Sequence, residues 1–140
     1  MLINYQNLYK IQQINLHDSI FKEVRYDYFQ KKIEVIVENK IWSTGNVSIE
    51  FKDVLYYEMT CCEFWGKGRS IICWSLMDTT NIYDKILRLE QVENAKSNSI
   101  DRTPMSLMEF LGSEFWMNSG DKLKIICKSI EIDDNLISKF

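Results

Sequence analysis

Alanine, proline and glycine are all scarce in this sequence. Its 140 residues contain one alanine, one proline and five glycines, against eighteen isoleucines. Alanine is the strongest helix former, whereas β-branched and aromatic residues suit a pleated, half-buried surface. The lack of alanine therefore argues against a helical bundle, and the lack of proline and glycine leaves little room for long flexible linkers. Together these absences predict one domain over residues 1–140, built mainly from strands.

Residues that commonly build catalytic and metal sites are scarce too. His17 is the only histidine, and the four cysteines contain no C-x-x-C pair. A catalytic zinc site usually needs two or three histidines, or cysteines at regular spacing, so we expect no metal site and no cofactor. A nucleophilic cysteine would find only His17 as its base. The sequence therefore predicts no catalytic residues and a protein that is not an enzyme.

His17, Asp18 and Ser19 hold the residue types of a hydrolase triad in one short run. A working triad needs three side chains that converge, whereas neighbours in sequence point in diverging directions. A structural role fits better, in which Asp18 or Ser19 accepts backbone N–H bonds before the first long strand. His17 and Asp18 remain candidate functional residues, facing either a ligand or a partner.

Signals for export, membrane insertion and phosphate binding are missing as well. The amino terminus has no basic region followed by an apolar run, and no stretch approaches the ~20 apolar residues of a membrane span. We therefore expect a cytoplasmic protein with reduced thiols, no membrane partner, and Cys73 and Cys127 buried in apolar runs. The net charge is −3, with both signs mixed along the chain. That balance argues against nucleic acid as a partner.

What the sequence does contain is a repeated alternation of apolar and polar residues, which is typical of half-buried strands. The alternation predicts strands at residues 20–28, 33–38, 47–52 and 123–127. A continuous apolar run at 70–77 predicts a central strand covered on both faces, and 107–117 predicts a hairpin partner for 123–127. Residues 53–65 fit helix and strand equally, so both stay open.

Two segments show helical spacing. Residues 4–13 predict a short amphipathic helix with Leu8 and Ile11 towards the core. Residues 82–95 predict a longer helix with Leu89 on its inward face, although the same segment also alternates and a strand stays open. The fold class that follows is α+β (mostly β): an antiparallel sheet or half-barrel of about six or seven strands with one or two helices.

Aromatic residues gather in the middle of the chain and again near residue 115. Core packing explains most of them. The sharper hypothesis is a partner-binding face in which aromatic residues have acidic neighbours, because aromatic side chains dominate binding energy at protein interfaces. The residues predicted for that face are Glu63, Trp65, Glu114 and Trp116. Aromatic residues stacked on a sheet also bind single-stranded nucleic acid, which is a separate alternative.

Three short motifs together resemble a known group of proteins. They are Leu16-His17-Asp18-Ser19, Val47-x-Ile49-x-Phe51-x-x-Val54 and Ser119-Gly120-Asp121-x-Leu123-x-Ile125-x-Cys127. The pattern is similar to small proteins of Gram-positive bacteria encoded near polymorphic-toxin loci, several of which are regarded as immunity proteins. The resemblance implies a cytoplasmic protein that neutralises a cognate toxin domain by binding it, and it supplies no catalytic residue.

Three functions therefore stand as expectations. The first is a non-enzymatic binding protein, in the form of an immunity protein against a bacterial toxin. The second is a small-molecule-binding domain or an enzyme with His17 in its site, which requires a deep pocket that contains His17 beside a carboxylate. The third is single-stranded nucleic-acid binding, which requires exposed stacked aromatic residues flanked by lysine or arginine.

Overall fold

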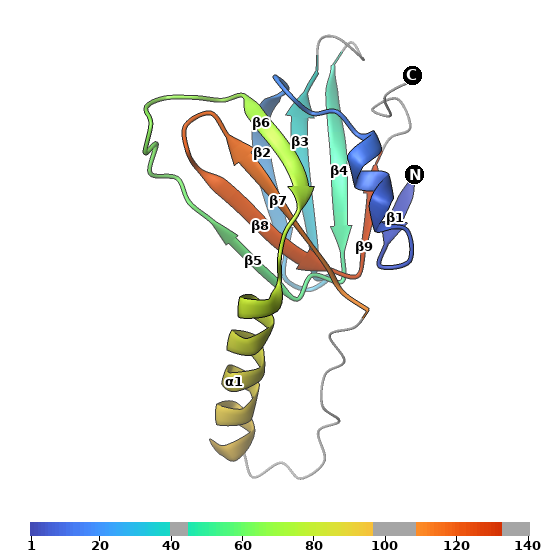
Figure 1. The fold of residues 1–140 in the computed structure, drawn as a ribbon, viewed down its shortest axis with the longest axis vertical. Helices are drawn as coiled ribbons and strands as arrows, with labels where there is room; N and C mark the ends of the chain where they lie inside the picture. Colours follow the sequence, from blue (N-terminus) through green and yellow to red (C-terminus); the bar gives the residue numbers. More distant parts are fainter. Residues whose placement is uncertain (40–44, 97–108, 133–140) are drawn as a thin grey trace.

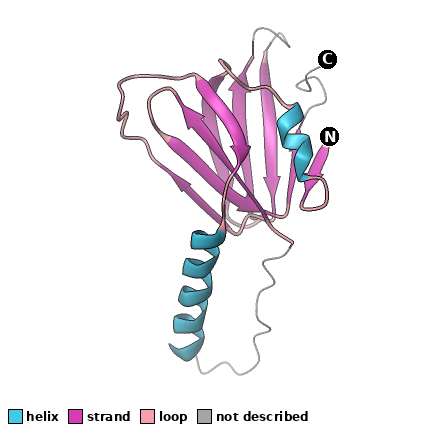
Figure 2. Ribbon diagram, in the orientation of Figure 1, coloured by secondary structure: helices cyan, strands magenta, loops and turns pink. Residues whose placement is uncertain are grey.

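The computed structural model describes residues 1–39, 45–96 and 109–132. In these residues it contains nine strands, one 3₁₀ helix and one α-helix (Figure 2). The strands form two antiparallel sheets, so the predicted α+β, mostly β class is confirmed. The strands outnumber the six or seven that were predicted, because three of them are too short to show a clear alternation.

The larger sheet has five strands in the order β1-β9-β4-β3-β2, and the smaller sheet has four in the order β5-β8-β7-β6 (Figure 1). The five are β1 (Leu2–Asn4), β9 (Ser129–Ile132), β4 (Asn46–Lys52), β3 (Lys32–Glu38) and β2 (Ile20–Asp27). The four are β5 (Tyr56–Met59), β8 (Lys122–Cys127), β7 (Leu111–Met117) and β6 (Ile71–Leu76).

The two sheets are joined along one side by chain segments that pass from one sheet into the other. β4 leads into β5 and β8 leads into β9, and these two bent segments pair with each other. At the bend, the Leu55 N–H donates to the Ile126 carbonyl at 2.8 Å and the Lys128 N–H donates to the Lys52 carbonyl at 3.1 Å. On the other side, the Phe21 N–H donates to the Arg69 carbonyl at 2.8 Å. The sheets therefore enclose one core between them.

An aromatic cluster fills the centre of that core. The rings of Trp74 and Phe115 stack at 5.2 Å with an interplanar angle of 6°. Phe51 from the larger sheet meets Phe115 edge to face at 6.0 Å, and Phe21 meets it at 5.8 Å. Such pairs add to the free energy gained from burial. Because Phe115 contacts residues of both sheets, it ties the two together.

β6 is not the central strand that its apolar run predicted. It lies at the edge of the smaller sheet, paired only with β7, so that prediction is wrong. The apolar run that suggested a central strand contains a register shift between Ile71 and Cys73. A β-bulge of this kind turns both Ile71 and Trp74 into the core, where they are buried, while Cys73 is only half-buried.

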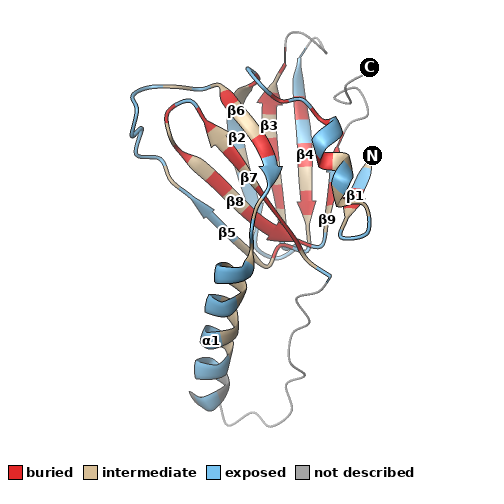
Figure 3. Ribbon diagram, in the orientation of Figure 1, coloured by how far each residue is buried: buried red, intermediate tan, exposed pale blue. Residues whose placement is uncertain are grey.

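The 3₁₀ helix η1 (Leu8–Gln13) lies in the segment predicted as an amphipathic helix, and its Ile11 is buried as expected. The α-helix α1 (Thr80–Lys96) confirms the helical alternative for residues 82–95. It extends away from the two sheets, and its described residues are exposed or half-buried (Figure 3). Leu89, predicted to face the core, is 55% exposed, so that part of the prediction is wrong.

Residues 53–65 contain β5 followed by a loop, so the strand alternative holds for part of this segment. The loop continues to residue 70 and crosses the end of the smaller sheet before β6 begins. This crossing brings the middle of the chain against the β7–β8 turn at residues 118–121. The candidate functional site forms there.

Candidate interaction surface

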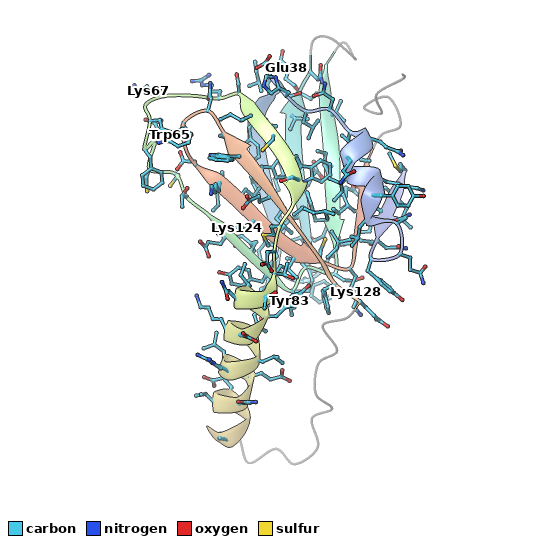
Figure 4. The ribbon with its side chains drawn as sticks, in the orientation of Figure 1. Glu38, Trp65, Lys67, Tyr83, Lys124 and Lys128 are labelled. Carbon is cyan, nitrogen blue, oxygen red and sulfur yellow. The ribbon has the colours of Figure 1, made fainter. Side chains whose placement is uncertain are left out.

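The loop between β5 and β6 exposes two large aromatic side chains at the end of the smaller sheet. Phe64 is 62% exposed and Trp65 is 64% exposed. Trp65 packs against Trp116 of β7, with ring centroids 5.9 Å apart. Figure 4 shows Trp65 and Lys67 on this loop, far from Tyr83 at the start of α1. We call Phe64, Trp65 and Trp116 the aromatic tip.

The carboxylate of Asp121 fastens this loop to the β7–β8 turn. Its Oδ1 accepts hydrogen bonds from the Thr60 hydroxyl and from the Cys62 backbone N–H, both at 2.8 Å. Its Oδ2 accepts from the Glu63 N–H at 3.0 Å and from the Ser119 hydroxyl at 2.9 Å. Four donors from two segments far apart in sequence therefore meet at one buried carboxylate.

These contacts have opposing effects on the pKa of Asp121. Desolvation raises the pKa, because burial disfavours the charged form. The hydrogen bonds from Cys62, Thr60, Ser119 and Glu63 favour the charged form, and together they leave the pKa of Asp121 below its usual value. The ionised carboxylate is therefore the form that holds the loop.

The close fit of loop and turn also depends on two glycines. Gly120 has a φ of +85°, and a Cβ added there would lie 2.9 Å from Cδ2 of Trp65. A Cβ added at Gly68 would lie 1.9 Å from Oδ1 of Asn118. The Trp65 N–H donates to the Ser119 carbonyl at 2.8 Å. The loop that carries Trp65 is thus bonded to the β7–β8 turn through its backbone, and the close packing leaves no space for a side chain at Gly120 or Gly68.

Basic side chains surround the aromatic tip. Lys122 Nζ lies 4.6 Å from the centroid of the Trp116 ring, a cation–π contact. Lys67 and Arg69 come from the same loop as Trp65, and neither side chain forms a salt bridge within the part of the chain that the structure describes. Glu63 is the acidic residue closest in sequence. The surroundings of the tip therefore carry charges of both signs, while the whole chain has a net charge of −3.

The outer face of the smaller sheet continues from the tip. Glu114 follows on β7, where it is paired in register with Lys124 of β8 and Ser75 of β6. Among the described residues, neither Glu114 nor Lys124 forms a salt bridge. On β5, the Tyr56 hydroxyl donates to Glu58 Oε2 at 2.6 Å, and this bond raises the pKa of Tyr56 to about 12. The charged groups of this face therefore remain accessible to a partner.

A small cavity of about 160 Å³ opens beside the tip. Its walls come from β2, β5, the β5–β6 loop, the end of β7 and the β7–β8 turn. They include Phe21, Met59, Cys61, Glu63, Met117 and Asp121. The sulfur-bearing side chains make part of the wall apolar. A space of this size holds one medium-sized side chain, since cavities of about 150 Å³ accommodate benzene.

The four residues predicted for a partner-binding face lie in the β5–β6 loop and on β7, and the structure joins two of them directly. Trp65 and Trp116 are in direct contact. Glu63 lines the cavity beside them, and its backbone N–H is bound to Asp121. Glu114 lies two residues before Trp116 on β7. Whether these four residues bind a partner stays a prediction, and the contact that the structure shows among them is the one between Trp65 and Trp116.

Trp65 and Trp116 differ in what they offer to a partner. Trp65 is mostly exposed, whereas Trp116 is half-buried beneath it. The indole N–H of Trp116 is buried and has no acceptor within the described residues. We infer that Trp116 supports the ring of Trp65 and that Trp65 and Phe64 make the outer contacts.

The structure places His17 and Asp18 on the surface. His17 Nδ1 lies 3.1 Å from Asp18 Oδ2, and the two side chains are 61% and 73% exposed. Neither lines the cavity beside the aromatic tip. The Asp18 N–H donates to the Ile71 carbonyl at 2.9 Å, and the Ile71 N–H donates to the Ser19 carbonyl at 2.8 Å. This segment therefore joins the sheets through its backbone.

Within the described residues, neither the Asp18 nor the Ser19 side chain accepts the backbone N–H bond that was predicted for one of them. The hydroxyl of Ser19 is buried and has no hydrogen-bond partner in the described part of the chain. Asp18 has a φ of +65°, so the chain turns sharply there. The segment is therefore held through its backbone bonds to Ile71, and the predicted side-chain acceptor role of Asp18 or Ser19 is wrong.

The four cysteines are free thiols in different environments. Cys61 and Cys62 are exposed in the loop, Cys73 is half-buried and Cys127 is buried. Burial raises the pKa of Cys127 to about 12, so this thiol behaves as a small apolar group. Over residues 1–39, 45–96 and 109–132, no three His, Cys, Asp or Glu side chains lie close enough to hold a metal ion.

No protein-family model matches the chain, and no curated protein sequence matches it. Among the described residues, no helix is both long and apolar enough to cross a membrane. The function of the chain is therefore inferred from the geometry of the aromatic tip and its surroundings.

Sequence reasoning missed the residue that organises this surface. Asp121 was visible only as part of a Ser-Gly-Asp motif in a turn. Its four donors include Thr60 and Cys62, which lie about sixty positions earlier in the chain. One signal was present: a Ser-x-Asp turn next to Gly120 indicates a carboxylate that accepts local hydrogen bonds. Nothing in the sequence indicated the second segment that it binds.

Proposed function

We propose that this chain is a non-enzymatic protein-binding domain that contacts its partner through the aromatic tip. The observation that carries the proposal is the combination of exposure and rigidity at Trp65. Exposed aromatic residues held in one position lose little entropy on binding, which is why they dominate binding energy at interfaces. The hydrogen bonds of Asp121 provide that rigidity before any partner arrives.

The partner class to test first is a bacterial toxin domain, which is what the resemblance to immunity-type proteins implies. An immunity protein works by covering a toxin in the cytoplasm, so it needs an accessible surface and no catalytic group. The exposed free thiols Cys61 and Cys62 agree with a reducing compartment. The mixed charge around Trp65 favours a partner surface with an apolar pocket bordered by carboxylates, which Lys67 and Arg69 would meet.

The experiment is co-expression with the toxin-like product of the adjacent gene, followed by measurement of the dissociation constant. Trp65→Ala is expected to weaken binding at least about a hundredfold, the size of effect seen at interface hot spots. Phe29→Ala is the matched control, because Phe29 is 95% exposed on the opposite β2–β3 turn. Wild-type affinity in the Trp65 variant would refute the proposed surface. The absence of any partner at micromolar concentration would refute the function.

Single-stranded nucleic acid is a second candidate, and one observation favours it. Lys122 lies over the Trp116 ring, with Lys67 and Arg69 nearby in the chain, so stacked aromatic residues do have basic neighbours. Retention of a fluorescent oligothymidylate, reversed by salt and abolished by Lys67→Glu, would support this candidate. Equal retention of the wild type and Lys67→Glu would exclude it.

A further inference from the structure

β5 is the sheet edge that is both open and apolar among the described strands. The edges of the two sheets are β1, β2, β5 and β6. An open edge presents unpaired N–H and C=O groups that can pair with another strand. The edge of β6 is partly covered, because Ile71 exchanges backbone hydrogen bonds with Asp18 and Ser19. β1 is only three residues long.

β2 is the longest of these edges, and its side chains oppose pairing with another strand. It carries Lys22, Glu23, Arg25 and Asp27. Charged residues on an edge strand disfavour the addition of another strand. β5 carries one charged residue, Glu58, between Tyr57 and Met59, which are 43% and 41% exposed. The two edges are therefore built differently.

The register of β5 shows which of its backbone groups are free. The Thr60 N–H donates to the Lys122 carbonyl at 3.1 Å, which makes these two residues a hydrogen-bonded pair. Such pairs alternate along an antiparallel ladder, so Glu58 with Lys124 and Tyr56 with Ile126 are hydrogen-bonded pairs as well. The N–H and C=O groups of Tyr57 and Met59 consequently point away from β8, towards the open edge.

The side chains of Tyr57 and Met59 lie next to further apolar surface. The Tyr57 ring is 4.8 Å from the ring of Tyr26 on β2. Met59 lines the cavity of about 160 Å³ beside the aromatic tip, together with Phe21 and Met117. A strand added to β5 would place alternate side chains over this surface, and the residue opposite Met59 would face the mouth of the cavity.

Charge determines which strand fits this edge. If a second copy of the chain paired through β5, the register that engages the outward groups of both residues on each copy would bring Tyr57 opposite Met59 of the second copy. That register places Glu58 opposite Glu58 of the second copy, and like charges directly opposite one another destabilise a sheet. A segment with lysine or arginine at this position would instead form a favourable cross-strand pair.

We propose that β5 is a docking edge for an extended peptide segment with a basic residue flanked by two apolar residues. The segment adds as a fifth strand to the smaller sheet. Its backbone bonds to Tyr57 and Met59, its basic side chain lies beside Glu58, and one apolar side chain enters the cavity. This docking edge adjoins the cavity beside the aromatic tip, but its backbone contacts are made on β5 and the inference does not depend on the proposed function.

The test uses a capped peptide, acetyl-Thr-Leu-Lys-Phe-Thr-amide, titrated into the full-length protein and followed by amide hydrogen exchange. Binding in the proposed register slows exchange of the Tyr57 and Met59 amide protons. The amides of Tyr56 and Glu58, already bonded to β8, remain unchanged. Slowing at β2 or β6, or no binding at millimolar peptide, would overturn the proposal.

Two altered peptides test the mechanism without changing the protein. Replacing the peptide lysine with glutamate is expected to weaken binding about tenfold, because two like charges then face each other. Methylating the peptide nitrogen that bonds to the Met59 carbonyl is expected to weaken it by at least about tenfold, because a buried hydrogen bond is lost. Equal affinity for all three peptides would contradict strand addition.

Matched protein variants complete the test. Glu58→Lys is expected to reverse the preference, so that the glutamate peptide binds more tightly than the lysine peptide. Asp84→Lys, an exposed charge reversal on α1, is expected to leave both affinities unchanged. An unchanged preference in Glu58→Lys would refute the assigned pairing.

Discussion

The outer faces of the two sheets differ in whether their charged residues form salt bridges. On the five-stranded sheet, Lys32 pairs with Glu50 at 2.9 Å and Lys52 pairs with Glu131. On the four-stranded sheet, Glu114 and Lys124 form no salt bridge within the described residues, and aromatic side chains stand beside them. On the first face, lysine and glutamate side chains pair with each other. On the second face, charged and aromatic side chains stay available to contact a partner. The second face is therefore the one on which we expect a partner to bind.

The comparison depends on the core that the two sheets share, so the largest expected effect comes from disrupting that core. Phe115 is fully buried and contacts Trp74, Phe51 and Phe21. Phe115→Ala is expected to lower the free energy of unfolding by about 3–5 kcal/mol. Urea denaturation followed by circular dichroism measures the change. A loss below about 1 kcal/mol would mean that the sheets are stable without this contact.

A smaller and local effect is expected when the anchor of the aromatic tip is changed. Asp121→Asn removes the charge that accepts four hydrogen bonds. The amides of Cys62 and Glu63 are expected to exchange roughly tenfold faster, because local opening of the loop becomes easier. The amides of β3 and β4 should be unaffected and serve as the internal control. Uniform acceleration in both sheets would show that the tip and the core are not separable.

The same carboxylate predicts a dependence on pH. Folding lowers the pKa of Asp121 below the value of about 3.9 that an aspartate has in an unfolded chain. Its contribution to stability is therefore complete above that value and is lost as the pH falls through the folded pKa.

Denaturation curves of the wild type and Asp121→Asn from pH 6 down to pH 2 measure this contribution. The difference in stability between the two proteins should be constant from about pH 6 to pH 5 and should shrink below about pH 4. Glu23 and Glu131 also have lowered pKa values, because of hydrogen bonds from Arg25 and Lys52, but both proteins contain them. A difference that is independent of pH would contradict the role given to the charge of Asp121.

The smallest effect is expected on the charge-paired face. Lys52→Gln removes the exposed pair with Glu131, and isolated surface pairs contribute little because water and salt screen them. We expect the urea midpoint to stay within experimental error of the wild type in 0.15 M salt. A marked loss of stability would mean that the five-stranded face depends on its ion pairs, and the contrast between the faces would need revision.

The fold could be predicted from the sequence where one face of a strand is buried and the other is exposed to solvent. β3 is the clearest case, since Ile33, Val35 and Val37 are all fully buried and their neighbours are not. Prediction failed where the chain departs from regular alternation. In β6, the bulge interrupts the alternation, and the resulting apolar run was interpreted as a central strand although β6 lies at the sheet edge. β9 is too short to show a pattern.

The candidate site could be predicted only in part, for a similar reason. Trp65 and Trp116 were predicted as parts of one face, because aromatic residues with charged neighbours indicate an interface. The role of Asp121 could not be predicted, since it depends on a loop about sixty residues away that crosses the β7–β8 turn. The exposure of Tyr57 and Met59 depends on the order of the strands in the sheet, which local sequence does not specify.

A hydrogen-exchange footprint of the chain, with and without the toxin domain proposed above as its partner, tests the central claim most directly. We predict protection concentrated in residues 60–70 and 118–122, with Phe64 and Trp65 at the centre and no change on β3 or β4. Protection of β3 and β4, with the loop unchanged, would place the partner on the charge-paired face and contradict the account.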